Sequence, residues 1–424
     1  MVLAYRGYSI MWVAPVTALV VALTGGLPLL DAYTNTYMEG FVGFTKSWFP
    51  TFMLGAIFGH LMDYTGAARS IAEWLTKIFG AERAILGVII GCAVLTYGGI
   101  SLFVVVFAMY PLALALFREA DITRKLIPGT IALGSFTFTM TALPGSPQIQ
   151  NLIPMEYYHT TPTAGAKMGI AATIFMFGMG YLYLRRREKS YKAKGEHFTE
   201  PTNVEQVDEA EVVNAPHPIF AVLPLLVVVV SLNLGKHIVG RDINIVEALT
   251  AGILVSMIVG YKNFKGFTKT ISAGANGSIT AIMNTSAAVG FGSVVKSVPG
   301  FQVLTKAVLG IKGSPLISQA IAVNLLAGAT GSASGGMGIA LEALGEKYYQ
   351  IALETGISPE AFHRVASLAS GGLDTLPHNG AVLTLLAITG MSHKESYIDI
   401  FVTSLLLPVL SSIPAIIVAM LGFV

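Results

Sequence analysis

The chain has 424 residues, of which 54% are hydrophobic and only 12% are charged, and its formal net charge is +2. Soluble domains carry about 25% charged residues, so the composition excludes an ordinary soluble protein, and the near-neutral charge gives no indication of a nucleic-acid partner. The single cysteine, Cys92, excludes a disulfide within one chain and a thiolate metal site, and we expect neither a metal nor a cofactor.

Apolar segments long enough to cross a membrane recur along the chain. About 20 apolar residues in a helix span a hydrocarbon core of roughly 30 Å. The opening segment 4–26 resembles a signal peptide, but we interpret it as a first span, with its crossing at 11–27, because further spans follow at 45–62, 219–235, 245–261 and 400–424. The sequence therefore predicts an all-α polytopic membrane protein that is embedded in the lipid bilayer.

Residues 185–218 form a clearly aqueous stretch between two apolar halves. The stretch is basic at first, acidic later and nearly free of large apolar residues, so we expect a linker with little fixed structure. By the positive-inside rule its basic cluster predicts a cytoplasmic linker at the plasma membrane. The cluster consists of Arg185, Arg186, Arg187, Lys189, Lys192 and Lys194.

The halves on either side of this linker resemble each other. The dipeptide Leu-Pro stands at 143–144 and again at 376–377, and "GAIFGH" (55–60) is echoed at the same offset by "AVGFGS" (288–293). Charge placement gives each half an odd number of crossings, so we predict two inverted repeats, which are typical of transporters. The span 219–235 has no partner in the first half. Either the first repeat lacks a helix or another helix precedes this chain, and we favour the second interpretation.

Four polar stretches rich in glycine and proline interrupt helix-length apolar segments. Two are the tips of predicted re-entrant hairpins, at 96–101 and 330–338, and two break spans, at 141–151 and 371–382. Broken backbone at membrane depth persists only where it lines a cavity or is buried in protein, and half-helix N-termini attract anions. A kinked helix whose freed carbonyls are satisfied internally is the alternative for any one break. We predict a substrate site formed by Thr96, Gly98, Gly99, Ser101, Gly145, Ser146, Gln148, Asn151, Thr330, Ser332, Ser334, Thr375 and Asn379.

The second break also holds an ionisable pair, Asp374 and His378. Residues four apart share a helix face, and a carboxylate at mid-depth costs about 2.5–3.5 kcal/mol on insertion scales, which predicts an ion-coupling site for a proton or a cation. The alternative is a pair that faces an outer vestibule. We interpret Asp63 and His60, near the inner surface, as an anchor or a cap. No Arg or Lys lies in any break, so hydroxyls and helix ends would hold a small anion.

Other function classes fit the sequence less well. "GSASG" at 331–335 misses the G-x-S-x-G spacing of a hydrolase nucleophile because its third residue is Ala333, so we do not expect an enzyme. A channel would need a continuous selectivity ring, whereas two inverted hairpins suit alternating access.

At these residues the chain resembles the gluconate permease family of the ion transporter superfamily. The segments that carry the resemblance are "GAIFGHLMDYTGAARSIA" (55–72), "FREADITRKLIPGTIALGSFTFTMTALPGSPQIQN" (117–151) and "LLAGATGSASGGMGIA" (325–340). The resemblance implies two inverted repeats, at 1–184 and 219–424, each with a re-entrant hairpin and a broken transmembrane helix. It also implies an elevator mechanism in which transport segments 84–184 and 312–424 move against a scaffold of 1–83 and 219–311.

The resemblance further implies a homodimeric secondary transporter that imports a small hydroxy- or keto-carboxylate by proton symport. Members associated with gluconate have a first break richer in proline and histidine than residues 143–147 of this chain. A shorter acid such as 3-hydroxybutyrate is therefore as good an expectation as gluconate. A sodium-coupled carboxylate symporter of the same architecture stays open, because backbone carbonyls such as those of 144–148 could coordinate Na⁺ without a carboxylate.

Overall fold

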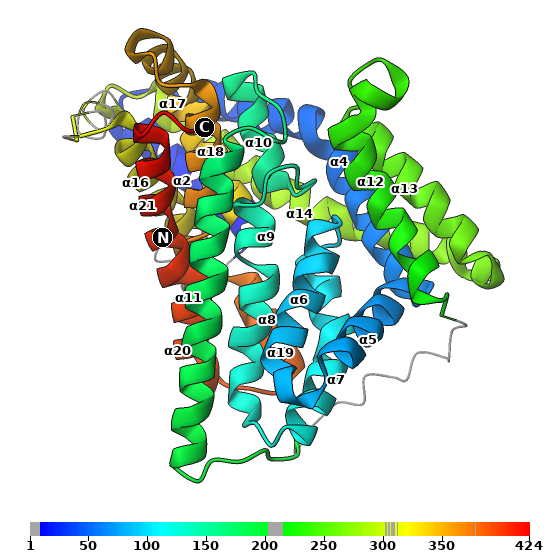
Figure 1. Cartoon of the computed structure of the whole chain (residues 1–424). Coiled ribbons are helices and arrows are strands. Elements are labelled where there is room, and N and C mark those ends of the chain that lie inside the picture. The colour runs from blue at the N-terminus through cyan, green and yellow to red at the C-terminus, as the bar shows by residue number, and fades with distance from the viewer. Residues whose placement is uncertain are drawn as a thin grey trace.

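The computed structural model describes residues 9–424 except 202–214, 302, 304–305, 307–309, 312 and 378, and its described regular structure is entirely helical (Figure 1). Four described helices are long and apolar enough to cross a membrane alone, and they span Ala166–Ala193, Pro218–Val239, Tyr261–Ser297 and His393–Met420. The predicted all-α membrane fold is confirmed.

The first half begins with two long apolar elements and continues into a hairpin and a broken helix. Helix α4 is the last part of one continuous helical segment that starts at Leu29. This segment is longer than the predicted span 45–62. Its elements are α2 (Ile10–Thr24), α3 (Leu29–Asp31), η1 (Ala32–Tyr37), α4 (Met38–Tyr64), α5 (Ala67–Phe79), η2 (Ala81–Arg83), α6 (Ala84–Tyr97), α7 (Leu102–Glu119), η3 (Arg124–Leu126), α8 (Ile127–Ser135), α9 (Phe138–Thr141), α10 (Ile149–Tyr158) and α11 (Ala166–Ala193).

The second half begins with an additional helix, α12, and it also contains a long helix, then a hairpin and then a broken helix. Its described elements are α12 (Pro218–Val239), α13 (Ile245–Val259), η4 (Tyr261–Gly266), α14 (Phe267–Ser297), α16 (Pro315–Thr330), α17 (Ala333–Thr355), α18 (Pro359–Ser370), η5 (Leu373–Thr375), α19 (Gly380–Thr389), α20 (His393–Ile400), η6 (Phe401–Leu406) and α21 (Leu407–Met420).

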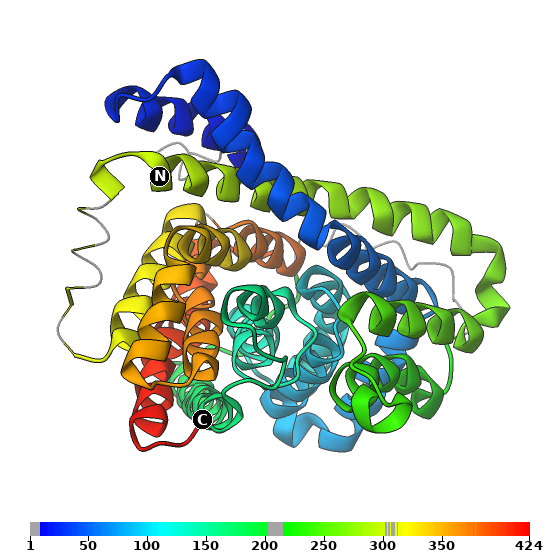
Figure 2. The same cartoon turned by 90° about the horizontal axis from the view of Figure 1, so that it is seen from above.

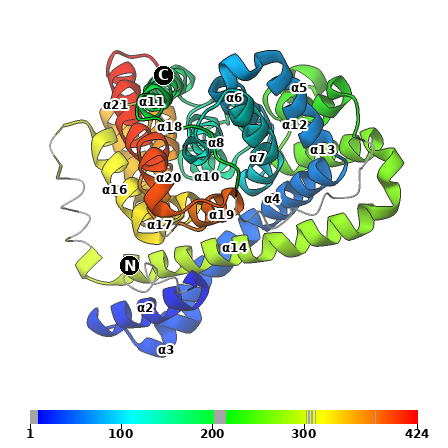
Figure 3. The same ribbon diagram turned by 90° about the horizontal axis from the view of Figure 1, so that it is seen from below.

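Helices α4 and α14 pack along each other and form one side of the molecule (Figure 3). Helix α13 packs on α4, and α2 packs on α14, so each long helix carries one helix from the opposite half. The hairpins and the broken helices lie together on the other side of α4 and α14, as the view from above also shows (Figure 2). Among the described residues α12 has no counterpart in the first half.

The two hairpins are α6–α7 and α16–α17, with tips where the backbone must turn sharply. Gly99 (φ +96°) and Gly331 (φ +62°) adopt left-handed conformations at these tips, which glycine accepts at little cost. Helix α18 begins as its sequence indicates, because the backbone N–H of Glu360 donates to the Ser358 hydroxyl at 3.2 Å and Pro359 occupies the first turn.

The predicted linker 185–218 is more ordered at its start than expected. Helix α11 continues to Ala193, so the first nine residues of that stretch are helical rather than unstructured. The helix is extended by ion pairs along one face, since Glu188 pairs with Arg185 (2.6 Å) and with Lys192 (3.1 Å). Beyond it, Glu200 pairs with Arg118 at 2.7 Å and fixes the linker against the end of α7.

Candidate functional site

Four helix N-termini meet at one cavity of about 710 Å³. The residues at these N-termini are Ser101 of α7, Gln148 of α10, Ser332 of α17 and Asn379 of α19, and all four line the cavity. Two of these helices follow hairpin tips and two follow breaks. Because each N-terminus presents backbone N–H groups and about half a positive charge, the arrangement is suited to an anion.

The four N-termini differ in how their first N–H groups are satisfied. The Ser332 hydroxyl accepts from Gly335 N–H at 3.1 Å, and the Asn379 side-chain oxygen accepts from Val382 N–H at 2.9 Å. Neither Ser101 nor Gln148 caps its own helix with its side chain. The first turns of α7 and α10 therefore keep backbone donors available to a ligand.

Each broken helix holds the hairpin tip of its own half through a side-chain amide. Gln148 Nε2 donates to the carbonyl oxygens of Thr96 (2.7 Å) and Ile100 (3.3 Å). In the second half, Asn379 Nδ2 donates to the carbonyl oxygen of Gly331 at 2.9 Å. Hairpin tip and break thus form one bonded unit in each half.

Most of the predicted site residues line this cavity. Those that do are Gly99, Ser101, Gln148, Thr330, Ser332, Ser334, Thr375 and Asn379, together with the predicted ion-coupling residue Asp374. His378 lies outside the described residues, so its predicted role stays a prediction.

Five predicted residues lie behind the cavity wall instead. The Ser146 hydroxyl donates to the Thr139 carbonyl (3.1 Å), and the Asn151 amide donates to the carbonyls of Ser146 (2.9 Å) and Pro162 (2.8 Å). The Gly145 carbonyl accepts from Asn233 at 2.9 Å. The Ser146 and Asn151 side chains thus satisfy freed backbone inside the protein, whereas the Thr96 hydroxyl has no hydrogen-bond partner among the described residues. The five predicted residues that are absent from the cavity lining are Thr96, Gly98, Gly145, Ser146 and Asn151.

Sequence reasoning missed the side of the cavity that α4 and α14 provide. His60 lines the cavity, and its interpretation as an anchor or a cap near the inner surface stays a prediction. The hydroxyl oxygens of Thr285 on α14 and Ser334 at the hairpin tip lie 3.5 Å apart. The signal in the sequence was a helical stripe of small and polar residues on α14 that faces the cavity: Gly277, Ser278, Ala281, Asn284 and Thr285.

Comparison with known proteins identifies the family. A family model described as "GntP family permease" matches residues 10–333. The chain belongs to the GntP permease family. The uncharacterized transporter YxjC of Bacillus subtilis is 42% identical to this permease over 438 residues, which cover 95% of this chain and 93% of YxjC. An uncharacterized transporter of Haemophilus influenzae is 26% identical over 157 residues, 37% of this chain and 36% of that protein.

A solved structure shares the fold of this permease. The crystal structure of the Alcanivorax borkumensis YdaH transporter, described as having an unusual topology, matches with a TM-score of 0.64 and 15% sequence identity, and covers 98% of this chain and 99% of that chain. The permease is thus an integral membrane transporter by family, and the likeness to YdaH extends over the whole fold.

Only two ionisable residues, His60 and Asp374, line the described cavity of the permease. A positively charged side chain does lie behind the first break, however, and the sequence alone could not place it there. Arg364 of α18 is fully buried, and its guanidinium donates to the carbonyl oxygens of Ala164 (3.0 and 2.7 Å) and Thr141 (3.3 Å). Because Arg364 is far from this break in sequence, only the packing of α18 brings them together.

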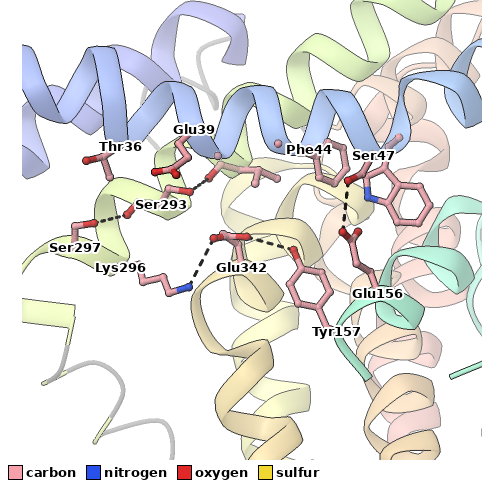
Figure 4. Close-up of a pocket in the computed structure, with 14 residues that line it drawn as sticks. Thr36, Glu39, Phe44, Ser47, Glu156, Tyr157, Ser293, Lys296, Ser297 and Glu342 are labelled. Atoms are coloured by element: carbon pink, nitrogen blue, oxygen red, sulfur yellow. Dashed lines mark hydrogen bonds and ion pairs between the residues drawn. The ribbon is translucent and has the colours of Figure 1, made fainter. Parts of the chain in front are cut away.

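A second pocket, of about 450 Å³, lies where α4 and α14 face α10 and α17 (Figure 4). Polar contacts cross it: Ser47 donates to Glu156 (3.4 Å) and Tyr157 donates to Glu342 (3.4 Å). Lys296 and Glu342 form an ion pair at 3.7 Å. The Ser47–Glu156 and Lys296–Glu342 contacts join the two long helices to α10 and α17, and the Tyr157–Glu342 contact joins α10 to α17.

Proposed function

We propose that this permease imports a small hydroxy- or keto-carboxylate, of the gluconate or 3-hydroxybutyrate type, by proton symport across the plasma membrane. The observation that carries the proposal is the meeting of four helix N-termini at one cavity whose described lining contains no Lys or Arg. Backbone donors and hydroxyls hold a carboxylate reversibly, which a carrier needs, because a cargo bound by a full salt bridge is released slowly.

Asp374 is the proposed proton carrier. It lines the cavity, is only 4% exposed, and its Oδ1 has no hydrogen-bond partner among the described residues. An ionised carboxylate in such a place has no ion-pair partner among the described residues, so its proton occupancy responds to the binding of a second charge nearby.

The bonding of the first break favours proton over sodium coupling there. The carbonyl of Pro144 accepts from the Tyr97 hydroxyl (2.9 Å), that of Gly145 accepts from Asn233 (2.9 Å), and that of Ser146 accepts from Asn151 (2.9 Å). Carbonyls that already accept hydrogen bonds are weaker candidates for a sodium ligand set. Sodium coupling remains the alternative, and its test is uptake driven by a sodium gradient.

We further propose that the transport segments 84–184 and 312–424 move as one body against a scaffold of 1–83 and 219–311. The hydrogen bonds from the side-chain amides of the breaks to the hairpin tips support this division. The hydrogen bonds from Arg364, in the second half, to the backbone beside the first break also support it. The inverted relation of the repeats, the cytoplasmic position of linker 185–218 and the homodimer belong to the same proposal.

The test is uptake by the reconstituted full chain. We expect labelled gluconate or 3-hydroxybutyrate to enter liposomes, and the neutral analogues glucose and 3-hydroxybutyramide to be excluded. Ser101→Ala combined with Ser332→Ala should weaken uptake of the acid by roughly 30-fold, at about 1 kcal/mol for each lost hydrogen bond. Ser272→Ala, which removes an exposed hydroxyl of α14, is the matched control. Uptake of the neutral analogue at the rate of the acid would contradict an anion site.

A further inference from the structure

Two buried charged residues of the chain have no ion-pair partner among the described residues. Five Asp, Glu, His and Arg side chains are buried in the described part of the protein, namely Glu188, His363, Arg364, Asp374 and Asp399. Glu188 pairs with Arg185 and Lys192, and Asp399 pairs with Arg187 at 2.8 Å. His363 contacts two neutral groups, the Thr160 hydroxyl (2.6 Å) and the Asn151 amide (3.3 Å). This leaves Arg364 and Asp374.

The environment of Arg364 solvates its charge but does not neutralise it. Carbonyl oxygens of Thr141, Pro162 and Ala164 accept its hydrogen bonds. Glu360, one turn earlier, is exposed, and its carboxylate accepts from Gly165 N–H. An arginine keeps its proton in proteins, so this side chain carries +1 in every state of the transporter.

Since the charge of Arg364 is fixed, the buried charge of the empty protein changes only when Asp374 gains or loses its proton. Among the described groups around it, His60 lies across the cavity, while His393 and Tyr397 contact the carbonyls of Pro377 and Thr375. His378 lies outside the described residues. Around Arg364 the ionisable neighbours are His363, Glu360 and Tyr97. None of these described groups forms an ion pair with either residue.

We propose that Arg364 is the fixed counter-charge that couples the proton to the substrate, so that the transport segments cross the membrane only when their buried charge sums to zero. The inference rests on the proposed function. Empty and with Asp374 ionised, the moving body carries +1 and −1. Loaded with a monocarboxylate and with Asp374 protonated, it carries +1 from Arg364 and −1 from the substrate. Both states are neutral, whereas substrate without proton gives −1 and proton without substrate gives +1.

The physical basis is the cost of an uncompensated charge in the bilayer. Insertion scales correspond to roughly a 100-fold penalty in population for one such charge at the bilayer centre. Obligatory coupling of one proton to one monocarboxylate follows from this penalty without direct contact between Asp374 and Arg364. Arg364 is a positioning residue in this account, since it acts through charge and not by touching the cargo.

The experiment uses the full chain in liposomes with labelled gluconate or 3-hydroxybutyrate, whichever the wild type transports. We expect wild-type accumulation to follow an imposed pH gradient and not an imposed K⁺/valinomycin potential. In Arg364→Gln the empty protonated body becomes neutral and the loaded protonated body carries −1, so uptake should slow by about 100-fold, and accumulation should lose the pH gradient and respond to the potential instead. One charge that crosses about 100 mV changes accumulation roughly 50-fold. Arg364→Lys should keep the coupling, and Arg241→Gln, which removes an exposed scaffold charge, is the control.

A second variant keeps the test independent of the folding of Arg364 variants. In Asp374→Asn the loaded body is neutral but the empty body carries +1, so exchange of internal for external substrate should persist while net uptake falls by about 100-fold. Equal loss of exchange and net uptake would overturn the inference, as would equal uncoupling by Arg364→Lys and Arg364→Gln. Arg364→Gln that still follows the pH gradient would overturn it and leave the proposed function standing. Wild type that transports neither acid would overturn both.

Discussion

The side-chain amide of Asn379 donates a hydrogen bond of 2.9 Å to the backbone carbonyl of Gly331, and this bond ties the second broken helix to the tip of the second hairpin. In the first half, Gln148 bonds the carbonyl of Ile100, and both pairs are separated by 48 positions along the chain. In each half, a hydrogen bond from a side-chain amide to a backbone carbonyl therefore holds a hairpin tip against a helix N-terminus. Both amide residues line the same cavity.

Removing this amide should weaken substrate binding more than it weakens the fold. In Asn379→Ala the Gly331 carbonyl loses its donor and the cap of α19 is lost, at a cost of about 1–2 kcal/mol, so we expect KM to rise roughly 5- to 30-fold. Concentration-dependent uptake in liposomes measures the change. Asn35→Ala, which removes an exposed amide bonded to Asp31, should leave KM unchanged. A KM for Asn379→Ala equal to that of wild type would show that the tip does not depend on this bond.

Locking the second pocket should stop transport. Ser47 on α4 and Glu156 on α10 contact each other at 3.4 Å across the proposed boundary between scaffold and transport segments. Cysteines at both positions, joined by a reducible bifunctional thiol reagent that spans the length of the Glu156 side chain, should abolish uptake, and reduction should restore it. Cys92, the single natural cysteine, is buried and should not interfere.

The control for this cross-link lies within the scaffold. Arg241, on the loop between α12 and α13, and Glu247, in the first turn of α13, are exposed ion-pair partners at 2.7 Å. Cysteines at these two positions should cross-link without loss of uptake. Full activity of the cross-linked Ser47→Cys/Glu156→Cys protein would argue against movement at this boundary.

The buried ion pair between α11 and α20 should stabilise the fold. Asp399 is fully buried and accepts from Arg187 (2.8 Å) and from the Tyr183 hydroxyl (2.7 Å). Removing one partner of a buried pair leaves an uncompensated charge and costs about 3–5 kcal/mol. We expect Arg187→Ala to lower the thermal unfolding midpoint in detergent clearly, and Arg187→Ala with Asp399→Asn to recover part of the loss. A double variant less stable than the single one would contradict this reading.

Docking of the linker on Asp121 should weaken at low pH. A hydrogen bond from the His197 side chain, 2.6 Å away, and one from Phe198 N–H lower the pKa of Asp121 below its ordinary value. A depressed carboxylate pKa gives an interaction that is fully present above the unfolded-state pKa, near 3.9, and is lost as the pH falls through the folded-state pKa.

Hydrogen exchange of the Phe198 amide reports this docking directly. We expect its protection factor, corrected for intrinsic rates, to be constant from neutral pH to about 5 and to fall below about 4. Asp121→Asn tolerates the left-handed backbone at this position (φ 50°) and should reduce protection at neutral pH, with little further effect below about pH 4. Because both partners are exposed, added salt should also reduce protection. A protection factor that does not change in Asp121→Asn would contradict a role for the carboxylate.

The sequence was informative wherever proline and glycine fixed the backbone. Both hairpin tips and both breaks fell where these residues predicted them, because few conformations are open to such stretches in a membrane. Which way a side chain points after a break is not encoded locally, and Ser146 and Asn151 turn inward to satisfy carbonyls. Arg364 was out of reach for another reason, since its partners lie in the other half of the chain.

Other parts of the site carried a signal that could have been used. The small and polar residues of α14 that face the cavity follow helical spacing, as Ser278, Asn284 and Thr285 show. The ion pairs of Glu188 with Arg185 and Lys192 follow helical i,i+3 and i,i+4 spacing, and this spacing accounts for the helix where a structureless linker was expected.

The central claim is proton-driven import of a small carboxylate, and one measurement tests it most directly. Labelled gluconate and 3-hydroxybutyrate are offered to liposomes that contain the full chain, with an inward pH gradient and no sodium, and then with a sodium gradient at equal pH. The account predicts accumulation of one of these acids under the pH gradient alone, about tenfold for each pH unit, and loss of net accumulation in Asp374→Asn. Accumulation that requires the sodium gradient and survives Asp374→Asn would contradict the account.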